Sequence, residues 1–311
     1  MNFLTQYGLF LLQSVTIVAA ALILVGGILS MGRKPKPKIE INSLNEIFDD
    51  LKHRLHKEII GKKLKKTKKD KTVKPKLFVI NFNGDIKASQ VDALREEITA
   101  ILSIAKPEDE VLLRLESPGG SVNGYGLAAS QLQRIRDQKI NLTVSIDKIA
   151  ASGGYLMACV GSKIIAAPFA IIGSIGVVAQ IPNFHRLLKK NDIDVELLTA
   201  GEYKRTLTLF AENNEKGRKK FQEDLEKIHD NFKNYVLTNR QQLDIAKVST
   251  GEHWLARDAF DLRLVDSLKT SDEYLAEKIE TFSAFKITVH SKQTLIAKIL
   301  KPAAKLLHPW A

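Results

Sequence analysis

The hydrophobic positions at the start of the chain form one long uncharged block. Residues 3–29 carry no Asp, Glu, Lys or Arg. As a helix the block is about 40 Å long at about 1.5 Å per residue, which is enough to cross a ~30 Å hydrocarbon core with tilt. A cleaved signal peptide has a basic start and a shorter apolar run, and neither occurs here. The pattern therefore predicts a retained transmembrane anchor over residues 1–30.

Residues 31–76 form a basic segment around a short amphipathic stretch. The segment holds 16 Lys and Arg against 6 Asp and Glu. Its large apolar residues recur at helical spacing; they are Leu44, Ile47, Leu51, Leu55 and Ile59. We expect a charged helical tether, which is either a solvated linker or a segment that binds anionic lipid headgroups.

From residue 77 the pattern alternates between apolar runs typical of buried strands and amphipathic stretches typical of helices. The predicted strands are 77–82, 111–117, 142–147, 163–169, 175–181 and 194–198, and the predicted helices are 91–105, 124–138, one starting at 153, and 215–239. Repeated strand-then-helix units with right-handed crossovers predict an α/β fold with parallel strands.

Two further apolar stretches have competing interpretations. Residues 164–181 are long enough for a second membrane span, but Pro168, Gly173 and Gly176 interrupt them, so two buried strands fit better. Residues 291–310 place lysines among leucines and isoleucines. They fit either an amphipathic helix on a membrane surface or a helix docked on a neighbouring subunit.

Charge and composition narrow the classes of function. The net charge is +12, yet most of the excess lies in residues 31–76, so the folded part is nearly neutral. A nucleic-acid-binding fold carries its excess charge on the fold itself, and we expect no nucleic-acid partner. Histidines and carboxylates show no metal-ligand spacing, no phosphate loop occurs, and no cofactor is expected. The single cysteine, Cys159, lies in an apolar run and is interpreted as a buried, inert thiol.

A candidate nucleophile stands where a predicted strand gives way to a helix. Ser152 in AASGGY is followed by Gly153, and small residues there let a substrate backbone approach. The turn SPGG after the strand at 111–117 offers the N–H groups of Gly119 and Gly120, which would stabilise an oxyanion if placed beside Ser152. Each motif by itself is also compatible with an ordinary turn.

The base for this serine is not evident from local spacing. None of the seven histidines has a catalytic setting. A buried lysine can serve, because desolvation disfavours the ammonium form. Lys204 in GEYKR is the best candidate, with Ser174 of GSIG to orient it; a surface lysine and a turn serine are the alternatives.

The ordered motifs LESPGGSVNGYG, IAASGGYLMA, APFAIIGSIGV and GEYKR resemble the signal peptide peptidase A family. The resemblance extends to about residue 270 and is closest to a branch with an N-terminal anchor, a basic tether and the run GYGLAASQLQR. It implies a crotonase/ClpP-like spiral of ββα units over residues 77–270, with residues 271–311 as a C-terminal tail. Two places depart from the family: Glu116 stands where many members have Asn or Asp, and Arg263-Leu264 replaces a usual glycine before LVD.

By this resemblance Ser152 is the nucleophile and Lys204 the general base of a Ser/Lys dyad. Ser174 assists the lysine, and Gly119 and Gly120 match the oxyanion loop. The predicted oxyanion hole is Gly119, Gly120 and Gly153. The expected protein is a serine endopeptidase of the bacterial inner membrane that cleaves signal-peptide remnants or other membrane-derived peptides. Half-length members of the family form oligomeric rings with inward-facing sites, so the resemblance implies a homo-oligomer for this chain.

Two other classes and the membrane side stay open at this point. The alternatives are a crotonase-type acyl-CoA enzyme and a catalytically silent membrane scaffold. The positive-inside rule, applied to the basic residues at 33–38, favours a cytoplasmic catalytic domain. The family resemblance favours the periplasm.

Overall fold

A computed structural model describes residues 6–18, 20, 38–61 and 74–290 of the 311-residue chain. The chain divides into two compact units, residues 39–289 and residues 1–38 with 290–311. In the second of these, residues 6–18 are helical. Within the described ranges, no helix combines the length and the apolar character needed to cross a membrane. The anchor expected over 3–29 lies only partly inside those ranges.

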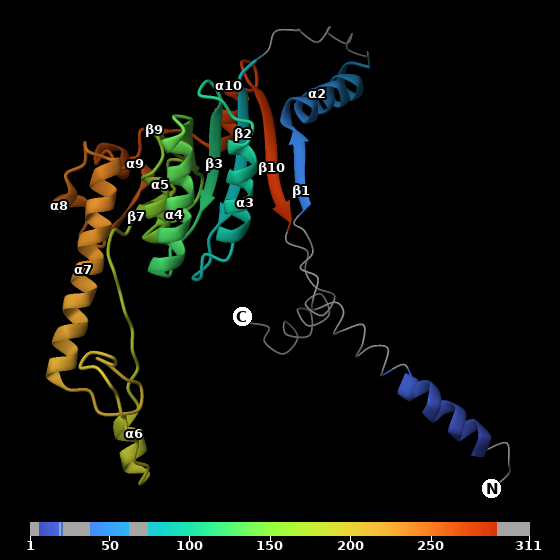
Figure 1. The fold of residues 1–311 in the computed structure, drawn as a ribbon. Coiled ribbons are helices and arrows are strands. Elements are labelled where there is room, and N and C mark those ends of the chain that lie inside the picture. The colour runs from blue at the N-terminus through green and yellow to red at the C-terminus, as the bar shows by residue number, and fades with distance from the viewer. Residues whose placement is uncertain (1–5, 19, 21–37, 62–73, 291–311) are drawn as a thin grey trace. The chain divides into compact units, whose positions relative to one another are not determined.

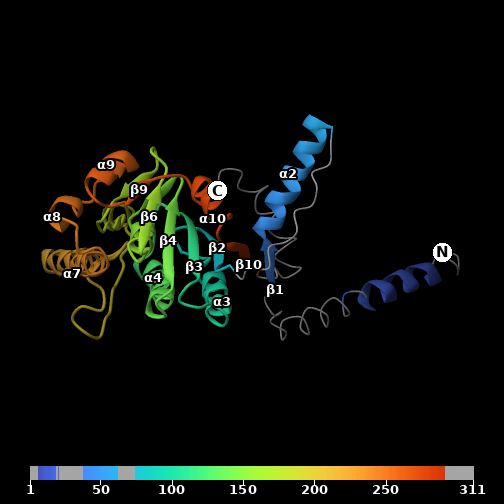
Figure 2. The ribbon, with the colours of Figure 1, turned by 90° about the horizontal axis from the view of Figure 1, so that it is seen from above.

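A seven-stranded sheet forms the centre of the larger unit (Figure 1). Its strands, in spatial order, are β1 (Lys38–Ser43), β10 (Ser283–His290), β2 (Lys76–Asn83), β3 (Glu110–Glu116), β4 (Asn141–Ile146), β6 (Lys163–Ala166) and β9 (Ser267–Leu268). Neighbours from β10 to β9 pair in parallel. The predicted α/β class and the strands at 77–82, 111–117 and 142–147 are confirmed. Figure 2 shows β3, β4 and β6 side by side along this sheet.

Helices cover both faces of the sheet, and successive side chains along each strand point alternately to the two faces. Phe78, Ile80 and Phe82 of β2 pack into the core beneath α3 (Val91–Leu102) and α4 (Val122–Asp137). Leu77 and Val79 point to the opposite face, where α10 (Ser271–Lys278) covers them. The period of two sends successive side chains to opposite faces, so a strand with helices on both sides reads as one continuous apolar run.

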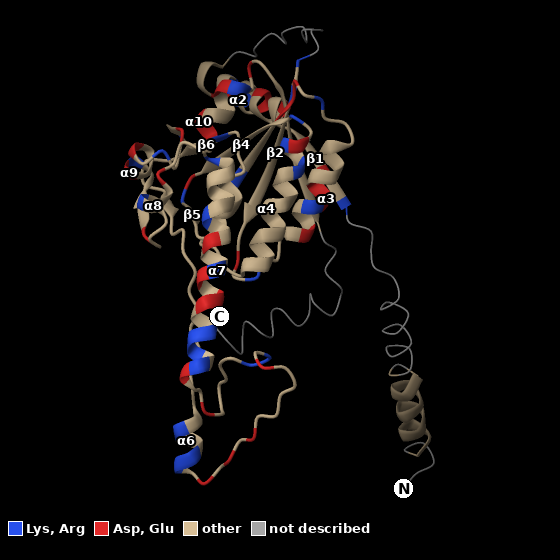
Figure 3. Cartoon of the chain, turned by 60° about the vertical axis from the view of Figure 1, so that its left-hand side comes forward, with Lys and Arg blue, Asp and Glu red and all other residues tan. Residues whose placement is uncertain are grey.

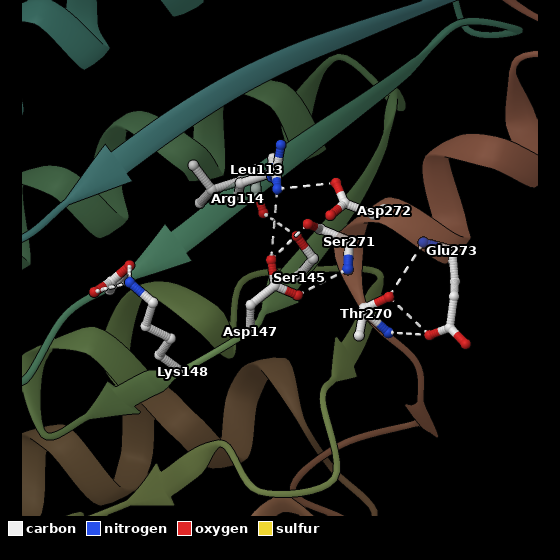
Figure 4. Close-up of polar contacts among 10 residues, drawn as sticks. Leu113, Arg114, Ser145, Asp147, Lys148, Thr270, Ser271, Asp272 and Glu273 are labelled. Carbon is white, nitrogen blue, oxygen red and sulfur yellow. Dashed lines mark hydrogen bonds and ion pairs between the residues drawn. The ribbon is translucent and has the colours of Figure 1, made fainter. Parts of the chain in front are cut away.

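The sheet continues beyond residue 270, where the family resemblance ended. Helix α10 begins with a capping box formed by Thr270 and Glu273. Figure 4 shows how polar contacts fasten the start of this helix to β3 and to the turn after β4. Ser271 donates through its backbone N–H to Asp147 at 2.8 Å, and the Arg114 guanidinium lies 3.1 Å from Asp272 and 3.7 Å from Asp147. β10 then lies beside β2, so residues 271–289 belong to the larger unit.

A second, three-stranded sheet contains β5 (Ile149–Ala151), β7 (Ile171–Gly173) and β8 (His253–Leu255). The apolar run 164–181 thus supplies β6 to one sheet and β7 to the other, and its residues Ile164, Ile165 and Ile172 are fully buried. The strand expected at 175–181 is wrong, because pairing stops at Gly173. The remaining helices are α2 (Leu44–Ile60), α5 (Gly153–Ala158), α6 (His185–Lys190), α7 (Glu215–Asn239), α8 (Ile245–Val248) and α9 (Ala256–Asp261).

Between β7 and α7 the chain forms a projecting segment, residues 177–210, called here the arm. It holds α6 and turns back on itself: Phe184 donates its N–H to the carbonyl of Leu209 at 2.7 Å and stacks on Phe210. Figure 1 shows α6 beyond the far end of α7 from the sheets. The strand expected at 194–198 is wrong. This part of the arm has no strand to pair with, and Leu198 is 89% exposed.

Candidate active site

Ser152 occupies a sharp turn between β5 and α5. Its backbone has φ 52° and ψ −119°, a conformation that residues with a side chain rarely adopt. The turn is held on both sides: the Ser152 N–H donates to the carbonyl of Gly173 at 2.8 Å, and the N–H of Leu156 donates to the Ser152 carbonyl. Nucleophilic serines of α/β enzymes are placed on strained strand-to-helix turns of this kind.

The SPGG turn lies directly against the Ser152 turn. Gly119 has φ 91°, and a Cβ atom there would lie 2.8 Å from each of three atoms: the Ala151 carbonyl oxygen, the Gly153 nitrogen and Ser152 Cβ. The two segments are joined by a bridge between Ser117 and Ala150, with hydrogen bonds of 2.8 and 3.0 Å. The structure therefore brings together two motifs that are more than thirty residues apart in the sequence.

Ser174 joins the same cluster. In the parallel pairing of β5 with β7, Ala151 is opposite Gly173, so Ser152 and Ser174 each come directly after the end of one of two neighbouring strands. Ser174 also has a positive φ of 52°, and its N–H donates to the carbonyl of Glu252.

A cavity of about 300 Å³ opens beside Ser152 and is predominantly apolar. Its walls come from the SPGG turn, α4, α5, the segment after Ser174 and the second half of α7. The residues are Gly120, Val122, Tyr125, Gly126, Ser152, Gly153, Leu156, Gly176, Val177, Val178, Ile228, Asn231, Phe232 and Tyr235. A cavity of this size and lining accommodates an apolar side chain next to the serine.

Lys204 is not among the residues that line this cavity. It is exposed on the arm, where the ring of its neighbour Tyr203 lies beneath the amines of Lys216 and Lys220 in the first turns of α7. Figure 3 shows the blue of Lys and Arg on α6 and on the end of α7 nearer to it. The cavity begins at Ile228, eight positions after Lys220, or about 12 Å further along the helix. Within one chain, the arm holds Lys204 at the other end of α7 from the cavity.

One histidine reaches the segment beside the serine. The Nε2 atom of His229 lies 3.2 Å from the carbonyl oxygen of Ile175, directly after Ser174. That contact ties α7 to the strand end, and His229 does not line the cavity. In the described part of the chain, no group of three or more His, Cys, Asp or Glu is placed to hold a metal ion.

Several residues around the serine are not among the site residues predicted from the sequence. Tyr125 is fully buried between the two glycine turns, and burial raises the pKa of its hydroxyl. Phe232 and Tyr235 on α7 close the cavity; burial raises the pKa of Tyr235 to about 12. Before folding, these residues look like ordinary core positions of two amphipathic helices.

The two departures from the family pattern have structural counterparts. Glu116, at the end of β3, accepts two hydrogen bonds from Lys148 at 3.0 and 3.1 Å, which links the strand before SPGG to the strand before Ser152. Arg263 has φ 60°, the left-handed region that glycine adopts without steric cost. The arginine therefore adopts a backbone conformation for which the usual glycine of the family is better suited.

A strained serine at a strand-to-helix turn, two glycine turns and an apolar cavity are features that hydrolytic sites on α/β scaffolds share. Comparison with known proteins gives the family. The model of peptidase family S49 matches residues 134–283, and that of the family's N-terminal region matches residues 2–132. The chain belongs to peptidase family S49 and is a SohB-like peptidase, which confirms the expected resemblance.

The two SohB relatives match over nearly their whole length. A probable protease SohB of Haemophilus influenzae is 48% identical over 97% of this chain and 93% of its own. A putative protease SohB of Buchnera aphidicola is 44% identical over 99% of this chain and 97% of its own. Protease 4 of Haemophilus influenzae is 29% identical over 64% of this chain and 33% of its own.

Proposed function

We propose that this peptidase is a membrane-anchored serine endopeptidase that works through an acyl-enzyme at Ser152. The observation that carries the proposal is the packing of the SPGG turn against the strained Ser152 turn at the mouth of the apolar cavity. Family membership favours peptide hydrolysis over acyl-CoA chemistry and over a silent scaffold.

In the proposed reaction the Ser152 hydroxyl oxygen attacks the carbonyl carbon of the scissile bond, and its proton passes to the neutral amine of Lys204. The oxyanion accepts hydrogen bonds from the N–H groups of Gly120 and Gly153. Gly119 holds the turn in place, since its own N–H already donates to Ser117 Oγ at 3.1 Å. The amine product leaves with the proton from Lys204, and water then hydrolyses the ester by the same route.

A lysine that acts as a base must be removed from water, because desolvation disfavours its charged form. Lys204 is exposed in a single chain, and the arm that carries it also exposes large apolar side chains. Val178 is 90% exposed, Leu198 89% and Leu187 57%. A projecting apolar segment of this kind is typical of a subunit interface. We therefore propose a homo-oligomer in which Lys204 is supplied to Ser152 by a neighbouring copy, with Ser174 orienting it.

Mixing two inactive variants tests this arrangement. Ser152→Ala and Lys204→Ala each abolish cleavage of an unfolded peptide, whereas Arg205→Ala, the matched change at the next exposed basic residue, leaves cleavage near the parent rate. If each site takes its serine and its lysine from different copies, random co-assembly of the two inactive chains restores about a quarter of parent activity. A dyad formed within one chain gives no recovery. Parent-like activity of either single variant would refute the Ser/Lys mechanism.

The N-terminal helix supports the proposal of a membrane anchor. Residues 6–18 contain no charged side chain, and their large apolar residues are exposed on several sides; Phe10 is 67% exposed, Leu12 69% and Ile17 70%. A helix that is apolar all round requires an apolar environment. Protein that remains with the membrane after alkaline washing, and is released by deletion of residues 1–30, supports the anchor. A reporter fused after Ala311 then decides which side holds the catalytic domain and hence which peptides it meets.

A further inference from the structure

The side chain of Tyr125 lies between the two segments that bear the proposed oxyanion donors. It is fully buried, on the first turn of α4. Its hydroxyl oxygen is 2.6 Å from Ser117 Oγ and 2.9 Å from the carbonyl oxygen of Asp85. Ser117 Oγ in turn accepts the N–H of Gly119 at 3.1 Å. Four residues are therefore joined in one hydrogen-bonded chain beneath the SPGG turn.

The direction of that chain follows from counting protons. A carbonyl oxygen only accepts, so the single hydroxyl proton of Tyr125 is donated to Asp85. The contact with Ser117 then requires Ser117 to donate its own proton to Tyr125. Ser117 Oγ keeps its lone pairs for the N–H of Gly119. Each donor has one acceptor, and the order from Gly119 through Ser117 and Tyr125 to Asp85 is the only one that satisfies all three bonds.

The ring of Tyr125 contacts the other segment. A Cβ atom on Gly153 would lie 2.4 Å from Tyr125 Cγ, so the backbone of Gly153 rests on the ring. The ring is held from behind by Phe82, edge to face, with centroids 6.3 Å apart. One side chain thus supports Gly153 through its ring and the SPGG turn through its hydroxyl.

The space around the hydroxyl pair is closed. A Cβ atom on Gly84 would lie 2.2 Å from Ser117 Oγ and 2.3 Å from the Tyr125 hydroxyl oxygen. The neighbouring backbone is also tied down, since the N–H of Ser121 donates to the carbonyl of Ile86 at 2.8 Å. Between these ties, no described residue accepts the N–H of Gly120, which remains available to a ligand at the cavity.

We infer that Tyr125 is the positioning residue of the oxyanion site, and that the hydrogen-bonded chain from Gly119 to Asp85 sets the orientation of the Gly120 amide. The inference rests on the proposed function. It predicts an effect on the transition state, because the ground-state carbonyl depends less on these amides than the oxyanion does. Loss of the tyrosine hydroxyl therefore lowers kcat and leaves KM nearly unchanged.

The test compares Tyr125→Phe, Ser117→Ala and their combination with Tyr274→Phe. Tyr274 is a matched control, since it is a buried tyrosine whose hydroxyl is bonded to Glu110 and Thr143 on the opposite face of the sheet. We expect each site variant to lower kcat by about ten- to a hundredfold, as for a small displacement of catalytic groups. KM stays within about twofold of the parent value. Because both substitutions break the same hydrogen-bonded chain, we expect the kcat of the double variant to be no lower than that of the worse single variant.

The outcomes separate this inference from the proposed function. A parent protein that neither cleaves peptides nor is labelled at Ser152 by a fluorophosphonate refutes both. An active parent whose Tyr125→Phe and Ser117→Ala variants keep the kcat of Tyr274→Phe refutes the positioning role alone. A double variant whose fold-loss in kcat equals the product of the two single losses also refutes the positioning role. Thermal unfolding checks that each variant is folded, and Ser117→Ala carries the test if Tyr125→Phe does not fold.

Discussion

The contact between the SPGG turn and the Ser152 turn predicts the consequence of adding one methyl group at Gly119. The residue has φ 91°, and its Cβ would lie 2.8 Å from two backbone atoms and from Ser152 Cβ. Forcing a side chain into left-handed backbone costs about 1–2 kcal/mol. Overpacking against backbone that cannot give way adds about 1–3 kcal/mol. Gly119→Ala should therefore lower the free energy of unfolding by about 2–5 kcal/mol.

Thermal and chemical unfolding measure this loss. For a domain of this size about 1 kcal/mol corresponds to about 2–4 °C, so we expect Tm to fall by about 4–20 °C. Peptide cleavage should fall by about a hundredfold or more at temperatures where the variant is folded, because the proposed oxyanion donors move away from Ser152.

Gly126→Ala is the control for stability. Gly126 lies within α4, and a Cβ there meets no atom within 4 Å. Alanine is the better helix former by about 0.8–1 kcal/mol, so this variant should be slightly more stable than the parent. If Gly119→Ala unfolds and cleaves like the parent, or if both alanines change stability equally, the packing of the two turns is not as described.

Three further predictions concern stability and thiol chemistry. Arg263→Gly should raise the free energy of unfolding by about 0.5–1 kcal/mol, because relief of left-handed strain exceeds the entropy glycine adds to the unfolded chain; an unchanged or lower urea midpoint would contradict this. Arg240 is 3% exposed and binds Asp266 through contacts of 2.6 and 2.9 Å. Arg240→Met should lower the free energy of unfolding, measured in urea, by about 3 kcal/mol. Lys148→Met, which removes the exposed ion pair with Glu116, should lower it by less than about 1 kcal/mol. Cys159 is fully buried and burial raises the pKa of its thiol, so Ellman's reagent at pH 8 should react only after unfolding; rapid reaction of the folded protein would refute the burial.

Much of the scaffold was predictable because its signals are local. The run Leu77–Phe82 alternates between two buried faces, and α7 starts and ends where the charge pairs of 215–239 do. The amphipathic spacing at 44–59 likewise corresponds to α2. The stretch 194–198 also contains closely spaced apolar residues, yet it is exposed and irregular, since a strand also needs a neighbour with free N–H and C=O groups.

The sequence by itself determined the family and predicted which short motifs carry the chemistry: the serine between small residues, the two-glycine turn, and the lysine that the family resemblance implies. Only the tertiary structure decided which of them meet. Parallel pairing of β5 with β7 and the bridge at Ser117 place Ser152, Ser174 and Gly119 together, because each crossover returns the chain to the same edge of the sheet. The arm has no such pairing and carries Lys204 away from its own serine. Tyr125 joins the site for the same reason, since its role depends on hydrogen bonds between residues 40 positions apart, which no local pattern records.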